Sequence, residues 1–194
     1  MSGAANTAGL ILAAGESRRM GYPKALLRYK DETFLDTLIG LFAERCSLVI
    51  VVLGSRAEEI RARTSRPAAF VVNPDYLRGM TTSLQCGLRA VPPEAHNILF
   101  TLVDHPSVAP ATLDALFAGS APVRVPRYKG RRGHPILFSR DLIPEFLALP
   151  ETGAARDIVR CHAAETEYLD LDDPGIMADI DDLDAYSGLI GAML

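Results

Sequence analysis

The chain has 194 residues, of which 48% are hydrophobic and 23% charged, and its formal net charge is −4. A chain of this length buries roughly 70% of the surface that its unfolded form exposes, and this composition excludes a disordered protein. The acidic balance argues against a surface for a nucleic acid polymer, although a locally basic pocket for a small polyanion stays open.

Four short apolar runs rich in Val, Ile and Leu occur in the first half of the chain and are typical of strands buried on both faces. These runs are residues 8–13, 48–53, 68–72 and 98–103. Between them, apolar residues at helical spacing predict helices around residues 34–42, near Ile60 and around residues 84–88. Alternating strands and helices predict a parallel sheet.

The pattern is less regular after Asp104. We expect a helix around residues 113–117, strands near 123–125 and 136–138, and then helices and a last strand near Tyr168. No internal repeat or low-complexity linker interrupts the chain. The sequence therefore predicts a single α/β domain over residues 1–194.

Cysteines and terminal segments bear on the compartment. Cys46, Cys86 and Cys161 are widely spaced and include no Cys-x-x-Cys pair, so we expect buried reduced thiols rather than disulfides or a zinc site. The N-terminus lacks the pattern of a signal peptide, and its first apolar run is too short to span a bilayer. We expect a cytoplasmic protein with no membrane partner.

The turn after the first predicted strand, Ala13-Ala14-Gly15, is followed by Arg18, Arg19 and Lys24. In open α/β sheets, ligands bind at the carboxyl ends of the strands, where this turn lies. Small residues let backbone N–H groups approach an anion, and the cationic side chains can bridge phosphate oxygens. The loop is neither a Walker A loop nor a Gly-x-Gly-x-x-Gly fingerprint. A plain strand-to-helix turn with solvated arginines is the alternative.

Asp104 follows a buried apolar strand, where an unpaired carboxylate is strongly disfavoured. A cation is therefore expected beside it, and carboxylate and phosphate oxygens suit Mg²⁺. A second ligand can come from the acidic cluster Asp179, Asp181, Asp182 and Asp184. The alternatives are a turn carboxylate at Asp104 and, in the cluster, a solvated helix start with aspartate caps.

Two further segments carry polar groups suited to a ligand. Residues 79–83, Gly-Met-Thr-Thr-Ser, follow the third strand, where the glycine allows close approach and the hydroxyls can bond to a base edge. A helix start capped by Thr81 or Thr82 is a compatible alternative. The second segment is a basic turn whose charges suit an anionic acceptor, and a solvated hairpin is the alternative. The turn contains Arg127, Lys129, Arg131, Arg132 and His134.

The run L-A-A-G-E-S-R-R-M-G-Y-P-K-A-L-L, residues 12–27, closely resembles the signature loop of the nucleotidyltransferase superfamily, in particular the molybdenum cofactor cytidylyltransferases. Four more segments resemble that family in the same order, at residues 73–88, 102–108, 133–138 and 178–184. Together the five matches extend over nearly the whole chain.

This resemblance implies a three-layer Rossmann-like nucleotidyltransferase fold with a mainly parallel sheet, in which residues 8–108 or so bind the nucleotide and residues 109–190 the acceptor. It implies an enzyme dependent on Mg²⁺, with Mn²⁺ as the other candidate metal. That enzyme joins CMP from CTP to the terminal phosphate of molybdopterin, or of molybdenum-molybdopterin, and releases pyrophosphate. A molybdoenzyme apoprotein or its chaperone is the further partner.

The resemblance also implies roles for single residues. Lys24, Arg18 and Asp104 are the catalytic group, and Asp181 joins Asp104 as a metal ligand, with Asp179 as the alternative. His134 and Arg156 face the acceptor. The predicted nucleotide contacts are Leu12, Ala13, Ala14, Gly15, Arg18, Lys24, Asn73, Gly79, Met80 and Ser83.

One position indicates which nucleotide is preferred, and others depart from the family pattern. Ala14 replaces a glycine of the guanylyltransferase loop, as it does in cytidylyltransferases, and so favours CTP over GTP. His105 stands where the family has Gln, and Arg156 follows an extra alanine. Two alternatives stay open: a related transferase with another nucleotide or a sugar or alcohol phosphate acceptor, and a non-catalytic accessory protein that holds nucleotide or cofactor.

Overall fold

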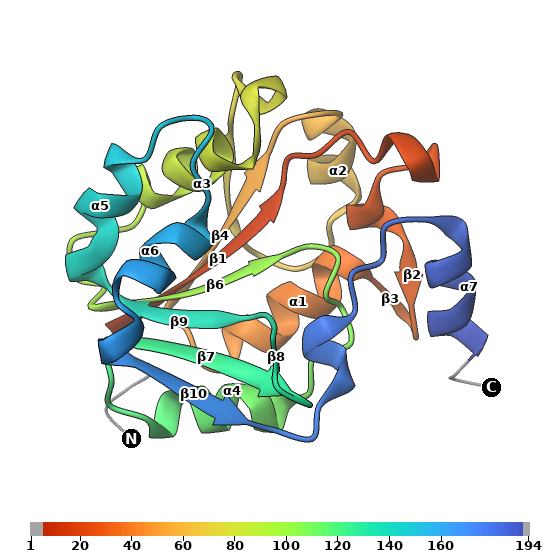
Figure 1. The fold of residues 1–194 in the computed structure, drawn as a ribbon. Coiled ribbons are helices and arrows are strands. Elements are labelled where there is room, and N and C mark those ends of the chain that lie inside the picture. Colours follow the sequence, from red (N-terminus) through yellow and green to blue (C-terminus); the bar gives the residue numbers. More distant parts are fainter. Residues whose placement is uncertain (1–5, 192–194) are drawn as a thin grey trace.

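A computed structural model of the chain describes residues 6–191 and consists of one large twisted sheet covered by helices on both faces (Figure 1). The sheet has eight strands in the order β10-β7-β9-β6-β1-β4-β5, with β8 paired to β7. Its strands are β1 (Thr7–Ala13), β4 (Leu48–Leu53), β5 (Ala69–Val72), β6 (Asn97–Leu102), β7 (Val123–Tyr128), β8 (Arg131–Arg132), β9 (Ile136–Ser139) and β10 (Thr166–Asp170). A separate hairpin pairs β2 (Arg28–Tyr29) with β3 (Glu32–Thr33).

Parallel pairing dominates the sheet, as the alternation of strands and helices predicts. Strand β1 pairs in parallel with β4 and β6, and β4 with β5. The antiparallel exception in the main order is β9, which lies between β6 and β7. Only a short hairpin through β8 separates β7 from β9, and a connection this short cannot make the crossover that parallel strands need.

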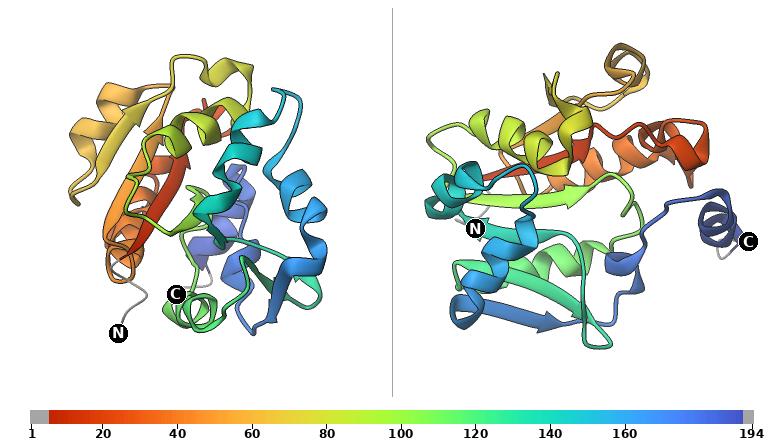
Figure 2. Two further views of the ribbon diagram at one scale, coloured as in Figure 1. Left: turned by 90° about the vertical axis from the view of Figure 1, so that its left-hand side faces the viewer. Right: turned by 45° about the horizontal axis from the view of Figure 1, so that its top comes forward.

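Two helical layers enclose the sheet (Figure 2). One layer packs on the face that carries Ile11 and Val51 and contains α1 (Phe34–Ala43), α2 (Ala57–Arg63), α4 (Pro110–Ala118) and α7 (Leu183–Gly191). The other packs on the face of Leu10 and Val52 and contains α3 (Met80–Arg89), α5 (Ile143–Ala148) and α6 (Ala155–Cys161). Neighbouring residues of β1 thus point to opposite faces and both are buried. The three-layer α/β arrangement agrees with the expected fold.

Two expectations about burial are wrong. The run at residues 68–72 forms an edge strand, β5, whose residues are half-buried or exposed, because no strand in the described part of the chain pairs with its outer side. Of the three free thiols, Cys161 is exposed at the end of α6, and Cys46 and Cys86 are half-buried. Burial raises the pKa of the Cys46 thiol to about 12. Among residues 6–191, no helix combines the length and the apolar character that a bilayer span requires.

Candidate functional site

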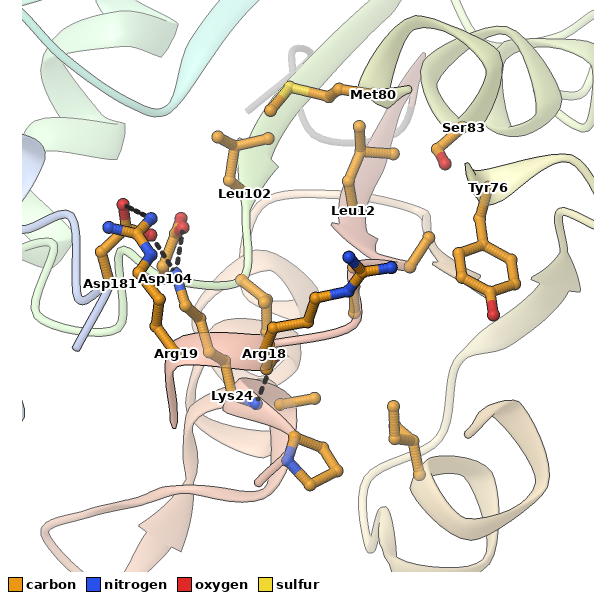
Figure 3. Close-up of a pocket in the computed structure, with 18 residues that line it drawn as sticks. Leu12, Arg18, Arg19, Lys24, Tyr76, Met80, Ser83, Leu102, Asp104 and Asp181 are labelled. Carbon is orange, nitrogen blue, oxygen red and sulfur yellow. Dashed lines mark hydrogen bonds and ion pairs between the residues drawn. The ribbon is translucent and has the colours of Figure 1, made fainter. Parts of the chain in front are cut away.

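A cavity of about 320 Å³ opens at the carboxyl ends of β1 and β6 (Figure 3). These strands are adjacent and parallel, with Leu12 opposite Leu102. The loop after β1 and the Asp104 segment after β6 therefore leave the sheet side by side. The cavity is lined by Leu12, Ala13, Ala14, Gly15, Ser17, Arg18, Arg19, Pro23, Lys24, Ala25, Ile60, Tyr76, Met80, Ser83, Leu102, Val103, Asp104 and Asp181.

The loop after β1 folds back on itself and brings Lys24 to this cavity. Ser17 has a left-handed backbone, with φ of 53°, and its hydroxyl accepts a hydrogen bond from the Lys24 backbone N–H at 3.1 Å. The Arg18 side chain is 78% exposed and pairs with Glu16 at 2.7 Å. In Figure 3 it points along the cavity away from Asp104, whereas Arg19 points toward Asp181. The two arginines thus serve different parts of the cavity.

Lys24 connects the two carboxylates that the sequence singles out. Its Nζ donates to Asp181 Oδ1 at 2.5 Å and to Asp104 Oδ2 at 3.2 Å, and Arg19 pairs with the other oxygen of Asp181. The hydrogen bond from Lys24 lowers the pKa of Asp181, and Arg19 contributes. Asp179 differs, because burial and then the nearby charges of Asp104 and Asp181 raise its pKa. The site is therefore an acidic cluster with one lysine beside it.

This cluster has the donors that a divalent cation needs. Asp104, Asp179 and Asp181 each offer an oxygen, and these oxygens lie within 4.8 Å of one another. Asp104 Oδ1 is buried and accepts no hydrogen bond from any described residue. Buried carboxylate oxygens are normally bonded, and oxygen-only ligand sets suit Mg²⁺ and Mn²⁺. The residues present therefore fit such a metal, and Asp179 belongs with the two aspartates that the sequence favoured.

The rest of the terminal acidic cluster has a structural role. Asp182 Oδ1 accepts a hydrogen bond from the Ala185 N–H at 2.9 Å, in the first turn of α7. Asp184 also lies in that first turn. Carboxylates are favourable at a helix N-terminus, so this half of the cluster is the capped helix start that the sequence offered as an alternative.

A second cavity, of about 470 Å³, adjoins the first, and both are lined by Met80 and Leu102. His134 and Arg156, the two predicted acceptor residues, line this second cavity together with Arg132, Thr81 and Gly153. The structure therefore brings most of the predicted nucleotide contacts to one cavity and both predicted acceptor residues to its neighbour.

Two histidine rings lie against each other, and one of them, His134, lines the second cavity. The centroids of the His105 and His134 rings are 4.9 Å apart, and His105 Nε2 lies 3.6 Å from Asp104 Oδ1. Burial, with a smaller contribution from Lys24, lowers the pKa of His105 to about 4. Burial and then His105 lower the pKa of His134 to about 4. Both rings are therefore neutral near pH 7.

Two predicted nucleotide contacts, Asn73 and Gly79, do not line the first cavity. Asn73 is buried, and its amide donates to Thr82 Oγ1 at 3.0 Å and to Ser83 Oγ at 2.9 Å. Asn73 therefore holds the Ser83 side chain, which does line that cavity. Gly79, with φ of 121°, is the residue before α3 and has a backbone that other residues rarely adopt.

The start of α3 also corrects an expectation about capping. Neither Thr81 nor Thr82 caps the helix, which begins at Met80 after Gly79 without a side-chain cap. The Thr81 hydroxyl donates instead to the Gly153 carbonyl, and the Thr82 hydroxyl donates to the carbonyls of Gly79 and Asp75. Both hydroxyls are thus bonded to carbonyl oxygens.

The basic turn is largely a surface hairpin. Arg127 pairs with Asp170 at 2.7 Å and lies over the Tyr168 ring, and Arg132 lies over the same ring. Lys129 and Gly130 form the turn with positive φ. Of the five basic residues in the turn, Arg132 and His134 line the second cavity.

Comparisons with known proteins agree with this geometry. The model of the MobA-like NTP transferase domain family matches residues 9–167. The chain is 29% identical over 184 residues to the molybdenum cofactor cytidylyltransferase of Escherichia coli, covering 91% of this chain and 92% of the relative. It is 27% identical over 189 residues to a probable molybdenum cofactor guanylyltransferase of Mycobacterium ulcerans, and the match covers 92% of this chain and 90% of that relative.

A solved structure of Rv0371c from Mycobacterium tuberculosis, in complex with manganese, is similar throughout. It superposes with a TM-score of 0.76 at 29% identity and covers 96% of this chain and 99% of that chain. The family match extends from β1 into β10 and ends before Asp179 and Asp181. The chain is a nucleotidyltransferase and belongs to the MobA-like NTP transferase domain family.

Proposed function

We propose that the chain is a Mg²⁺-dependent cytidylyltransferase that transfers CMP from CTP to the terminal phosphate of molybdopterin or of molybdenum-molybdopterin. An oxygen of that phosphate attacks the α-phosphorus of CTP, and the bond to the β-phosphate oxygen breaks. Pyrophosphate leaves with both electrons of that bond. In this proposal about residues 8–108 bind the nucleotide, and about residues 109–190 bind the acceptor.

The observation that carries the proposal is the position of the Lys24, Asp104 and Asp181 cluster. Asp104 comes two residues after Leu102, which lines both cavities, and Lys24 and Asp181 lie in hydrogen-bonding reach of one another. A triphosphate in the first cavity and an anionic acceptor in the second would meet beside these groups. Positioning and charge neutralisation supply most of the catalysis in such a transfer.

Each residue has a role that follows from its charge and place. Asp104 and Asp181 would hold the metal, with Asp179 beside them, and the metal would neutralise charge on the phosphates. Lys24 and Arg18 would stabilise negative charge on the same phosphates. The segment from Leu12 to Gly15 would present small residues and backbone N–H groups to the triphosphate.

The nucleotide assignment rests on Ala14 and on the relative from Escherichia coli. Ala14 lines the first cavity where guanylyltransferases have a glycine, and the Escherichia coli relative is a cytidylyltransferase. Met80 and Ser83 would face the base, with Asn73 holding Ser83 and Gly79 setting the helix start. The acceptor assignment rests on His134 and Arg156 in the second cavity. A molybdoenzyme apoprotein or its chaperone would receive the product.

A panel of triphosphates and acceptors tests the proposal. Pyrophosphate release is measured from CTP, GTP, ATP and UTP, each with molybdopterin, a sugar phosphate or an alcohol phosphate, in the presence of Mg²⁺. The proposal predicts release from CTP that depends on molybdopterin. Faster release from GTP, or with another acceptor, would assign a related transferase instead. Tight nucleotide binding without release in any combination would indicate an accessory protein.

A further inference from the structure

The first turn of α3 forms the wall between the two cavities. Met80 lines both of them and is 59% exposed, Ser83 lines the first cavity, and Thr81 lines the second. A ligand that contacts this turn from the nucleotide side therefore acts on a segment that also borders the acceptor side.

Side chains in and just before α3 contact the end of α5 and the connection between α5 and α6, residues 149–154. The Thr81 hydroxyl, on a side chain that is only 6% exposed, donates to the Gly153 carbonyl at 2.5 Å. Arg78, just before α3, pairs with Glu151. One turn further along, Gln85 Nε2 donates to the carbonyls of Phe146, Leu147 and Leu149, at 3.2, 3.3 and 2.9 Å.

These three contacts differ in strength. Gln85 reaches the carbonyl oxygens of three residues at and just after the end of α5, so it anchors the fold. Arg78 and Glu151 are about half exposed, at 55% and 49%, and such pairs contribute little. The Thr81 bond is partly buried on a side chain that is itself buried, and its loss leaves the Gly153 carbonyl without this partner. The Thr81 bond is therefore the contact best able to transmit a change in the first turn of α3 to residues 149–154.

The connection leads directly to an acceptor residue. The Ala154 N–H donates to Asp157 Oδ2 at 2.9 Å and the Asp157 N–H to the Ala154 carbonyl at 2.8 Å, which fixes the start of α6. Arg156 lies in this first turn and lines the second cavity with Gly153. The position of Gly153 therefore sets the position of Arg156.

We propose that Thr81 is a positioning residue that couples the two cavities: a nucleotide that orders the first turn of α3 also orders residues 149–156 and strengthens acceptor binding. This inference rests on the proposed function for the placement of nucleotide and acceptor. Coupling of this kind requires only an element that both ligands bias, and it is reciprocal, so the acceptor strengthens nucleotide binding by the same factor.

Amide hydrogen exchange of the full chain tests the coupling without an acceptor. Exchange of residues 149–156 is followed with and without each of CTP, GTP, ATP and UTP plus Mg²⁺, in the wild type, Thr81→Val and Thr81→Ser. Thr81→Val keeps the branched shape and removes the hydroxyl. Thr64→Val is the matched control, because the Thr64 hydroxyl also donates to a backbone carbonyl, that of Ile60 in α2, and Thr64 itself lines neither cavity.

We expect at least one triphosphate to slow exchange at residues 149–156 in the wild type, in Thr81→Ser and in Thr64→Val, and not in Thr81→Val. In turnover, Thr81→Val should raise the KM for the acceptor by about fivefold, as the loss of one hydrogen bond implies, with a smaller change in the nucleotide affinity measured without acceptor. Thr81→Ser should restore the wild-type KM.

The outcomes separate this inference from the proposed function. Protection by another triphosphate and not by CTP would overturn the CTP assignment and support the coupling. Turnover of CTP with unchanged exchange at residues 149–156, or with equal protection in Thr81→Val, would overturn the coupling and leave the function standing. Protection by none of the four triphosphates would also overturn the coupling.

Discussion

Lys24 Nζ lies 2.5 Å from Oδ1 of Asp181, a residue 157 positions further along the chain. This ion pair joins the loop after the first strand to the segment before the last helix. The Lys24 side chain is only 12% exposed, so solvent screens the pair less than it would on the surface. Without that ammonium group, three carboxylates would lie close together with no buried cation between them.

Lys24→Ala should therefore destabilise the metal-free protein and make its stability depend more strongly on metal. The carboxylates of Asp104, Asp179 and Asp181 repel one another, and a bound divalent ion relieves that repulsion. We expect a loss of about 1–3 kcal/mol in EDTA, much of it recovered with Mn²⁺ or Mg²⁺. Thermal unfolding with and without metal measures this. Arg19→Gln, at a more exposed partner of Asp181, is the control, and equal metal responses in both variants and the wild type would contradict the account.

Gly15→Ala should weaken nucleotide binding without lowering stability. A Cβ built at Gly15 meets nothing within 4 Å, and the residue has no positive φ, so the fold itself does not require glycine there. Close approach of a triphosphate to the backbone would require it. Calorimetric titration with CTP and urea unfolding check the two halves of this prediction. Gly188→Ala, which also faces open space but lies in α7, should leave CTP affinity unchanged. Unchanged affinity in Gly15→Ala would remove the loop from the phosphate site.

Asp173→Asn should lower the free energy of unfolding by about 2–3 kcal/mol, although this residue touches neither cavity. Asp173 is buried, and its carboxylate accepts hydrogen bonds from the N–H groups of Ala109 and Gly175 and from the Thr112 hydroxyl, at 2.9, 2.8 and 2.6 Å. The NH₂ group of an asparagine at this position would face groups that are themselves hydrogen-bond donors. Urea unfolding measures the loss, and Asp170→Asn, which is 68% exposed, should change stability little. Similar losses in both variants would show that burial of this carboxylate is unimportant.

Stability should fall as the pH is lowered from about 6.5 to about 4, in part because of His105 and His134. The pKa of each ring is about 4 in the folded chain, below the usual value of 6.5. In this window the unfolded chain binds more protons than the folded chain, so acid favours unfolding. Each ring contributes on the order of 2–3 kcal/mol over the window. Urea unfolding between pH 7 and 4.5 in EDTA should show a shallower decline for His105→Gln than for the wild type. Parallel curves would contradict the lowered pKa.

The sequence predicts the core of this fold well because its strands are apolar runs with clear helical stretches between them. Burial on both faces of β1, β4 and β6 leaves a pattern that the residues themselves display. It cannot show that β9 runs antiparallel or that β5 is an edge, since strand order depends on contacts between distant residues. For the same reason, the Thr81 bond to Gly153 replaced the cap that local sequence suggested.

The candidate site was predictable where a residue type conflicts with its surroundings. Asp104 after an apolar strand is such a case, and the structure places it beside Lys24 and Asp181. Arg19 was not predicted as a partner of Asp181, because the sequence offers two adjacent arginines with no sign of which one turns inward. The catalytic roles of Lys24, Arg18 and Asp104 stay predictions.

Pyrophosphate release from CTP on addition of molybdopterin, followed as Mg²⁺ is titrated into the wild type and into Asp104→Asn, tests the central claim most directly. Loss of an outer-shell partner of a metal ligand costs about 10- to 100-fold in metal affinity or activity, so removing a ligand carboxylate itself should cost at least as much and strongly reduce release throughout the Mg²⁺ titration. The account predicts rapid release that requires CTP, molybdopterin and Mg²⁺ in the wild type, and nearly none in Asp104→Asn. Equal release by the two proteins would contradict the assignment of Asp104 as the metal ligand of a nucleotidyl transfer site.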